Sequence, residues 1–365
     1  MTSEVRQNKT TGEWVIYAPS RRQRPEDYLE EETTRMSVPE HDEDCPFCAG
    51  NEEMLPRIAL EMPGPGREQW QTRVVPNKFP ALTPDGQHER ERRGIYVSMP
   101  GYGYHEVIIE SPRHNRTIMD ATVAEMEVIV ETYHRRYVQL MTKHENMMAI
   151  LFRNHGSRSG ASLIHPHSQL VVTGVVPRHV RWREDVAERY FDRWGRCVFC
   201  DILAFEREEG RRVIAENDSF LAFVPFAAEV PFEIWIMPKT HRADFGSISE
   251  AEKGDFAAAL HEVLARLYTR LDDPDYNYVI NGAAQYRADE PQLHWYLRIR
   301  TRLVTRAGFE IGSGMTINPS LPESDADFLN GAEGGLSLEP NPATAGRWRG
   351  LANPPHPSAS GASLR

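Results

Sequence analysis

The chain has 365 residues, and its 42 lysines and arginines against 53 aspartates and glutamates give a formal net charge of −11. This acidic balance argues against general binding to nucleic acids or anionic membranes, which needs a basic face, although a phosphorylated small molecule remains possible where arginines gather locally. No apolar run approaches the length of a membrane span, and the N-terminus MTSEVRQNKTTGEW is too polar for a signal peptide. We therefore expect a soluble, cytoplasmic protein with one large domain or two ordinary ones.

The predicted secondary structure contains two long amphipathic helices among six strands. In chain order the sequence predicts a strand at 105–111, a helix at 120–141, strands at 148–154, 168–176 and 232–238, a helix at 249–271, and strands at 277–281 and 294–304. Asp120 is placed to cap the first helix, and Ser249 with Glu252 has the spacing of a capping box for the second. Strands mixed with long helices predict an α+β fold built on sizeable sheets.

The four cysteines form two C-x-x-C pairs, Cys45 with Cys48 and Cys197 with Cys200. A redox C-x-x-C usually opens a helix after a strand, whereas Cys45 follows the acidic, turn-prone stretch PEHDED. Two such pairs in an apparently cytosolic chain favour metal binding over disulfides.

The chain also resembles itself. The matching positions are Cys45 and Cys197, Asn77 and Asn217, His114 and His241, Asn154 and Asn281, and His165 and His294. The shift is 127 residues for His114 and 129 for His165. These matches predict a duplicated strand–strand–helix–strand unit, with an N-terminal half over 1–180 and a C-terminal half over 181–318. Residues 319–365 are rich in proline, glycine and serine without periodicity, so we expect a disordered tail there.

Each half brings two thiolates and two imidazoles, which is the donor set of a closed tetrahedral zinc site. The candidate ligands are Cys45, Cys48, His114 and His165 in the first half, and Cys197, Cys200, His241 and His294 in the second. His41, His105 and His155 compete for these roles but lack counterparts in the second copy. The alternative is that the cysteines carry no metal in a reducing cytosol. Two thiolates favour zinc or another metal that accepts soft ligands, and iron stays open for the second site.

The two copies differ at one chemically important position. His167 follows His165 by two residues, whereas Tyr296 follows His294. An imidazole retained in only one copy is a candidate nucleophile, and a neutral histidine can attack phosphorus. Ser162 and Gln169 flank it, and the stretch GSRSGAS, which includes Gly160, offers backbone N–H groups to a phosphate. The alternative for that stretch is a plain turn between strands.

These residues resemble the galactose-1-phosphate uridylyltransferases of the histidine-triad superfamily over about residues 10 to 318. The motifs are EWVIYAPSRRQRP, CPFC, NKFPAL, SPRH, FRNHGSRSGAS, HPHSQL and GFEIGSG. The resemblance implies two fused histidine-triad-like halves with largely antiparallel sheets packed by helices, usually as a homodimer. It also implies an enzyme of galactose metabolism that acts by a ping-pong reaction. In that reaction His167 takes the uridylyl group of UDP-glucose, releases glucose 1-phosphate, and passes the group to galactose 1-phosphate.

The resemblance further assigns roles to individual residues. It implies that Ser162 and Gln169 contact phosphate oxygens and that the first Cys-Cys-His-His set holds a structural zinc. It implies that Asn77 and Asn154 lie at the nucleotide and that Glu310, with Phe309, belongs to a segment that meets the hexose. It also matches Arg21 and Arg24 to the arginines of the family's R-x-x-R-P segment, and we add Gly160 of the Gly/Ser stretch as a further candidate for substrate binding.

Other features are similar to the branch that includes the ADP-glucose phosphorylases. These features are the second C-x-x-C, FEIWIMP and GFEIGSGMTINP. That branch uses the same histidine chemistry to move an adenylyl group to inorganic phosphate. The stretch after GFE departs from the uridylyltransferase pattern, which leaves the sugar acceptor open. Uridylyl transfer is our first interpretation. Adenylyl transfer, a histidine-triad hydrolase and a two-zinc interaction module without activity are the alternatives.

Overall fold

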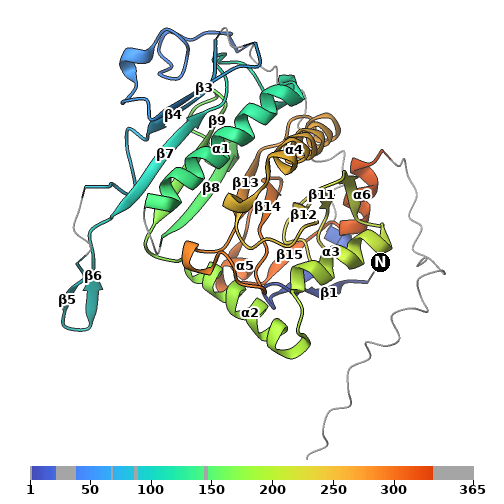
Figure 1. Cartoon of the computed structure of the whole chain (residues 1–365). Coiled ribbons are helices and arrows are strands. Elements are labelled where there is room, and N and C mark those ends of the chain that lie inside the picture. Colours follow the sequence, from blue (N-terminus) through green and yellow to red (C-terminus); the bar gives the residue numbers. More distant parts are fainter. Residues whose placement is uncertain (1, 22–37, 67–68, 86–88, 144–146, 332–365) are drawn as a thin grey trace, which may run out of the picture. The chain divides into compact units, whose positions relative to one another are not determined.

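A ten-stranded sheet is formed by strands of both halves of the chain, and Figure 1 shows how these strands are arranged. The structure is a computed structural model that describes residues 2–21, 38–66, 69–85, 89–143 and 147–331. The strand order is β10-β11-β12-β14-β13-β8-β9-β7-β4-β3, and all neighbours are antiparallel. Its strands are β3 (Leu60–Pro63), β4 (Trp70–Pro76), β7 (Gly103–Ile109), β8 (Met148–His155), β9 (His167–Thr173), β10 (Val213–Glu216), β11 (Phe220–Phe223), β12 (Ile234–Pro238), β13 (Tyr276–Asn281) and β14 (Tyr296–Thr301). The six strands predicted from the sequence correspond to β7, β8, β9, β12, β13 and β14.

The order of this sheet is symmetric about the pair β8 and β13. Outward from this pair, β9, β7, β4 and β3 on one side match β14, β12, β11 and β10 on the other. The predicted α+β fold with a duplicated unit is therefore confirmed. One hydrophobic cluster includes residues of both halves, such as Leu170 and Leu297, so the two copies share a core. The limits of the halves at 180 and 318 stay a prediction.

Two long helices cover one face of the sheet. They are α1 (Val123–Lys143) and α4 (Glu250–Leu271), and they contact each other. Ser249 and Glu252 form the predicted capping box of α4. Asp120 does not cap α1 as predicted, because its carboxylate accepts from Thr117. Thr122 caps α1 instead, together with Glu125.

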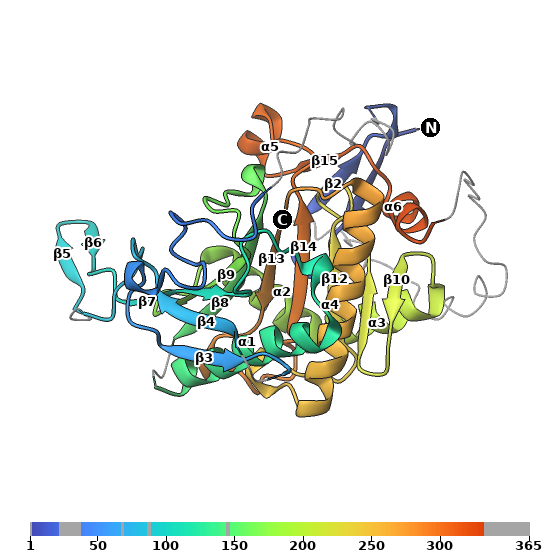
Figure 2. The ribbon, with the colours of Figure 1, turned by 90° about the horizontal axis from the view of Figure 1, so that it is seen from above.

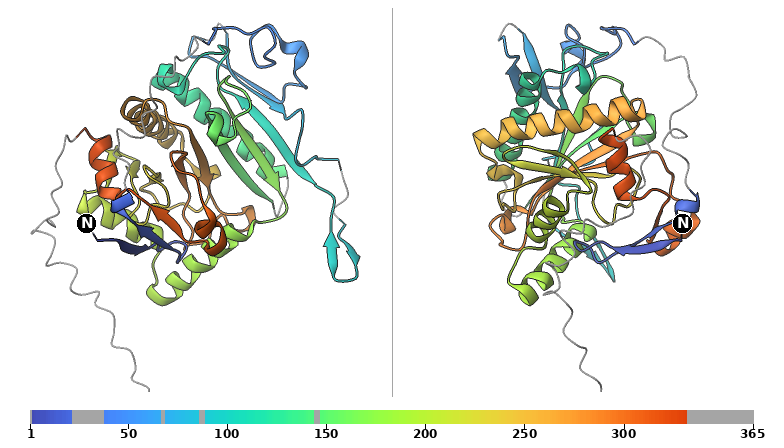
Figure 3. Two further views of the ribbon diagram at one scale, coloured as in Figure 1. Left: turned by 180° about the vertical axis from the view of Figure 1, so that it is seen from behind. Right: turned by 90° about the vertical axis from the view of Figure 1, so that its right-hand side faces the viewer.

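The opposite face of the second half is covered by α2 (Arg178–Trp194) and α3 (Val198–Glu209). In Figure 3 (right), α4 and α2 lie on opposite sides of the strands. On the same face of the first half, Phe47 from the first C-x-x-C packs near Val107 and Ile109. This face, away from α1 and α4, carries His167.

The remaining elements lie outside the large sheet. β1 (Glu4–Gln7), β2 (Trp14–Tyr17) and β15 (Thr316–Asn318) form a small sheet that joins the N-terminal segment to the end of the second half. The hairpin of β5 (Glu91–Arg93) and β6 (Tyr96–Ser98) stands apart from the other elements in Figures 1 and 2. The helix α5 (Gly308–Ser313) precedes β15. No helix in the described part of the chain is long and apolar enough to cross a membrane.

The prediction of disorder from residue 319 onward is wrong for residues 319–331. Residues 319–331 contain the helix α6 (Pro322–Leu329), which buries Ala326 and Leu329 against the shared core. Pro322 begins this helix, where the N–H group that proline lacks would have no partner within the helix. A proline-rich sequence is therefore compatible with a helix at this point. Residues 332–365 lie outside the described residues.

Candidate active site and metal centres

The four predicted ligands of the first half converge on one buried point. Sγ of Cys48 lies 3.5 Å from Nδ1 of His114 and 3.7 Å from Nδ1 of His165, and Sγ of Cys45 lies 3.8 Å from Nδ1 of His165. All four donor atoms lie within 4.8 Å of one another. A tetrahedral zinc with Zn–S of about 2.3 Å and Zn–N of about 2.1 Å separates sulfur and nitrogen by about 3.6 Å. The donor set and its spacing therefore fit a metal ion such as zinc.

The ring of His165 is oriented for this purpose. Its Nε2 donates to the backbone oxygen of Ser111 at 2.8 Å, which leaves Nδ1 free to bind a cation. Burial lowers the pKa of His165 to about 4, so the imidazole is neutral. Burial also raises the pKa of the Cys45 thiol to about 11, which disfavours the thiolate unless a cation stabilises it.

The predicted ligands of the second half also converge. Sγ of Cys200 lies 3.2 Å from Nδ1 of His241 and 3.5 Å from Nδ1 of His294, and Cys197 completes a set within 4.8 Å. Nε2 of His294 donates to the backbone oxygen of Pro238 at 3.0 Å, as His165 does to Ser111. This cluster is more exposed than the first, because His241 lies at the surface. Cys197 caps α3, so this pair does open a helix, although it does not follow a strand.

His167 is the first residue of β9 and is 7% exposed. Its Nδ1 donates to the backbone oxygen of His165 at 2.8 Å, and no described residue bonds to Nε2. Nε2 therefore carries the lone pair of the neutral ring. Burial lowers the pKa of His167, which favours this neutral form. The ring of Phe47 meets the imidazole at 61°, with the centroids 5.4 Å apart.

Gln169 shares the face of His167, because side chains two residues apart on a strand point the same way. Its Oε1 lies 2.8 Å from Nε2 of His105 on β7. Asn77 lies beside the same ring, with Nδ2 3.2 Å from Nε2 of His105. The structure therefore places Asn77 and Gln169 beside the same imidazole, that of His105, which we considered only as a metal ligand.

The Gly/Ser loop that follows β8 is held by residues of the second half. Nδ2 of Asn277 donates to Oδ1 of Asn154 at 2.7 Å and to the backbone oxygen of Ser159 at 2.9 Å. A carboxylate oxygen of Asp275 accepts from the backbone nitrogen of Arg158 at 2.5 Å. Gly156 has φ of +82°, and a Cβ there would lie 1.8 Å from Oδ1 of Asp275. Only glycine fits at this position.

A buried polar cluster lies on the other face of the sheet, behind His167. Oγ of Ser168 contacts Glu110 at 2.5 Å and the hydroxyl of Tyr133 at 2.6 Å, and Tyr133 contacts Tyr278 at 2.7 Å. Glu110 also forms an ion pair with Arg153. We did not predict a role for these residues from the sequence. A serine at a core-facing position of β9 was the available indication.

The structure does not connect the other predicted substrate contacts with His167 through any described interaction. Ser162 and Gly160 are exposed in the loop before β9, and no described interaction links them to His167. Phe309 is 50% exposed on α5. The carboxylate of Glu310 accepts from the backbone nitrogens of Ala307 and Ile317, so it stabilises its own segment. The side chain of Arg21 and all of Arg24 lie outside the described residues.

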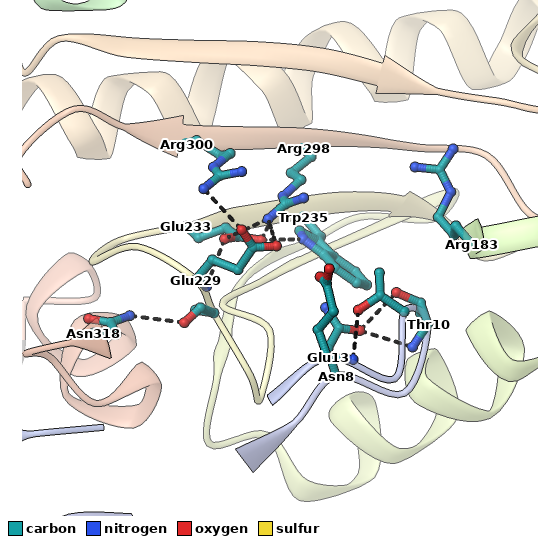
Figure 4. Close-up of polar contacts among 12 residues, drawn as sticks. Asn8, Thr10, Glu13, Arg183, Glu229, Glu233, Trp235, Arg298, Arg300 and Asn318 are labelled. Carbon is teal, nitrogen blue, oxygen red and sulfur yellow. Dashed lines mark hydrogen bonds and ion pairs between the residues drawn. The ribbon is translucent and has the colours of Figure 1, made fainter. Parts of the chain in front are cut away.

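The matching face of the second half carries a different polar set (Figure 4). Tyr296 begins β14 where His167 begins β9, and Arg298 occupies the position of Gln169. Arg298 forms ion pairs at 2.8 Å with both Glu229 and Glu233. Tyr296 therefore stands where the first half has the imidazole of His167, the candidate nucleophile.

Comparisons with known proteins identify relatives that match most of this chain. Residues 1–177 match the family model described as galactose-1-phosphate uridyl transferase, N-terminal domain, and residues 183–310 match its C-terminal domain. An ADP-glucose phosphorylase from Arabidopsis thaliana is 35% identical over 332 residues, which cover 89% of this chain and 92% of the relative. A galactose-1-phosphate uridylyltransferase from Thermotoga maritima is 28% identical over 341 residues, which cover 90% of this chain and 98% of the relative. A crystal structure of an ADP-glucose phosphorylase from A. thaliana with bound ADP-glucose has a TM-score of 0.76 and 31% identity, and covers 92% of this chain and 100% of that one.

Proposed function

The chain belongs to the galactose-1-phosphate uridyl transferase family of nucleotidyltransferases, and from that premise we propose that it transfers a nucleotidyl group through a covalent bond to Nε2 of His167. The observation that carries this proposal is the hydrogen bond from Nδ1 of His167 to the backbone oxygen of His165. It fixes the tautomer in which Nε2 is the nucleophile.

The proposed reaction has two displacements at the α-phosphorus. In the first, the lone pair of Nε2 forms a bond to phosphorus while the bond to the bridging oxygen breaks, and glucose 1-phosphate leaves with that oxygen and its electrons. In the second, a phosphate oxygen of the acceptor attacks the same phosphorus, and the electrons of the N–P bond return to Nε2. The proton on Nδ1 stays throughout, and the His165 oxygen stabilises the positive charge on the ring.

Charge on the phosphoryl oxygens needs fixed donors. We propose that the amide of Gln169 and the backbone of the loop at 156–160 supply them. Gln169 is supported by its place on the face of His167, and the loop by its attachment to Asp275 and Asn277. Ser162, Asn77 and Asn154 stay proposed contacts of the substrate, together with Gly160, Phe309, Glu310, Arg21 and Arg24.

We propose zinc at both Cys-Cys-His-His clusters, where it would act as a structural cation. Cys45, Cys48, His114 and His165 would hold the first ion, and Cys197, Cys200, His241 and His294 the second. The first site also bears on the chemistry, because His165 contributes its ring to the cluster and its backbone oxygen to His167.

Two nucleotide donors are candidates. Adenylyl transfer from ADP-glucose to phosphate is supported by the A. thaliana relative at 35% identity, against 28% for the T. maritima uridylyltransferase. Uridylyl transfer from UDP-glucose to galactose 1-phosphate, our first interpretation of the sequence, is supported by the family model over both halves. We now place ADP-glucose first and UDP-glucose second. A cytoplasmic homodimer stays part of the proposal, and sedimentation of the purified protein tests its oligomeric state.

The deciding experiment is intact-mass spectrometry after incubation with ADP-glucose or UDP-glucose in separate tubes. We expect one adenylyl adduct per chain with ADP-glucose, its loss on addition of phosphate, and no adduct in His167→Asn. A uridylyl adduct that galactose 1-phosphate discharges would reverse our order of donors. Discharge by water alone would indicate a hydrolase, and the absence of any adduct would leave a zinc-binding interaction module.

A further inference from the structure

His105 on β7 is held by two hydrogen bonds that together fix its protonation. Its Nδ1 lies 3.1 Å from the backbone nitrogen of Ala81, and its Nε2 lies 2.8 Å from Oε1 of Gln169. A backbone N–H can only donate, so Nδ1 must accept. The neutral ring then carries its proton on Nε2 and donates it to Gln169.

This bond determines which end of the Gln169 amide is available. Oε1 is engaged by His105, and no hydrogen bond to the amide nitrogen of Gln169 comes from the residues that the structure describes. Nδ2 of Asn77 lies 3.2 Å from Nε2 of His105, but both groups are donors in this tautomer, so this contact is a close approach and not a hydrogen bond. Oδ1 of Asn77 accepts from the backbone nitrogen of Phe79 at 2.9 Å, which leaves Oε1 of Gln169 as the acceptor for the Nε2 proton of His105. Gln169 can therefore present donors to a phosphoryl group at His167.

The second half contains a polar pair at the same two positions. Val107 on β7 is paired with Gln169, and Trp235 on β12 is paired with Arg298. His105 precedes Val107 by two residues, and Glu233 precedes Trp235 by two. Glu233 bonds to Arg298 at 2.8 Å, as His105 bonds to Gln169 (Figure 4). In the first copy His105 on β7 orients the side chain two residues after His167, and in the second copy Glu233, directly before β12, orients the side chain two residues after Tyr296.

We propose that His105 is a positioning residue, whose Nε2–H holds Oε1 of Gln169 so that the Gln169 amide nitrogen faces the phosphoryl group on His167. This inference rests on the proposed function, because it requires nucleotidyl transfer at His167. His105 touches no substrate in this role and acts only through Gln169.

A matched pair of variants separates donation from packing. His105→Gln keeps an N–H donor near the position of Nε2, whereas His105→Glu is almost the same size but offers only acceptors. His105→Glu should turn the Gln169 amide and slow formation of the nucleotidyl adduct by about tenfold, because the phosphoryl group then faces an acceptor. His105→Gln should stay within about threefold of the wild type. The concentration of nucleotide sugar that gives half the maximal rate of adduct formation should change little in either variant. Metal content and thermal unfolding serve as controls for folding.

A second background tests whether His105 acts through Gln169. In Gln169→Ala the difference between His105→Gln and His105→Glu should disappear. Equal rates of the two variants in the wild-type background, or an undiminished difference in Gln169→Ala, would overturn the proposal.

A measurement without turnover covers the case in which the wild type forms no adduct with either donor. We expect ¹⁵N NMR of histidine-labelled protein, with His105 assigned from His105→Gln, to show the Nε2–H tautomer. An Nδ1–H tautomer would reject the inference, whereas missing adduct with the Nε2–H tautomer present would reject the proposed function.

Discussion

The backbone oxygen of His165 accepts a hydrogen bond from Nδ1 of His167, with 2.8 Å between the two atoms, while the ring of His165 belongs to the first Cys-Cys-His-His cluster. One residue thus connects a candidate metal centre to the candidate nucleophile. The ring of His165 is fixed by Ser111 on one nitrogen and faces the cysteines with the other. Any change that moves this residue should therefore also disturb the tautomer of His167.

Replacing His167 with alanine should abolish the nucleotidyl adduct and leave the fold intact. Its ring forms one hydrogen bond to a described residue, the backbone oxygen of His165, and contacts the ring of Phe47. Its loss should therefore lower the stability without unfolding the protein. Mass spectrometry measures the adduct, and metal analysis and circular dichroism serve as controls. Loss of one metal ion in this variant would instead make His167 a ligand.

Metal analysis of the purified protein should find two zinc ions per chain, and Cys45→Ser should reduce this to one. The same variant should slow adduct formation strongly, because the first cluster orients His165 and through it His167. Cys200→Ser is the matched control in the second half. It should also remove one zinc, but it should leave adduct formation closer to that of the wild type. Similar kinetic losses in both variants would contradict the proposed link between the first cluster and the nucleophile.

Gly156→Ala should impair the active-site loop much more than it impairs the rest of the fold. The new Cβ would collide with Asp275, and the backbone at φ of +82° adds about 1 kcal/mol of strain. Gly12→Ala is the control, because Gly12 has φ of +74° and a Cβ added there would meet nothing within 4 Å. Both variants should lose stability from strain in urea unfolding, and Gly156→Ala should lose more because of the collision with Asp275, but only Gly156→Ala should slow adduct formation. Unchanged kinetics would show that the loop does not contribute donors.

The second half should be sensitive to acid through Glu229. Burial opposes its ionisation, but Arg298, Arg300 and Arg306 outweigh burial and lower its pKa to about 2. A folded pKa below the unfolded value means that the ionised group stabilises the protein above pH of about 4.5, and that this stabilisation disappears as the pH falls toward 2. The shift corresponds to about 3 kcal/mol.

Urea unfolding at pH 6 and pH 3 tests this sign. Glu229→Gln should be less stable than the wild type at pH 6, and the difference should narrow at pH 3. Glu13→Gln, at an exposed glutamate, should show neither effect. A difference that widens in acid would contradict the assignment.

The sequence alone was sufficient where the information is local or chemically distinctive. The periodicity of 120–141 and 249–271 identified both long helices, because one apolar face must be buried at every turn. The eight candidate ligands could be identified because few residue types bind zinc and because their order repeats in two copies, and the structure brings each set of four together. The contrast between His167 and Tyr296 singled out the candidate nucleophile for the same reason.

Only the tertiary structure decided how the copies align and which side chains meet. The sequence repeat suggested that β12 follows β7 by 127 residues, the shift from His114 to His241. In the structure Val107 pairs with Gln169, and Trp235 pairs with Arg298, so Trp235 matches Val107 at a shift of 128. The two copies therefore differ by one residue between these strands and the histidines that follow them. A strand reverses its faces with every residue, so this single step decides that Glu233, and not Phe232, matches His105. The contacts of His105 with Gln169, and of Asp275 and Asn277 with the loop after β8, join residues 64 to 118 positions apart. Such pairs follow from strand order and register, which no local pattern specifies.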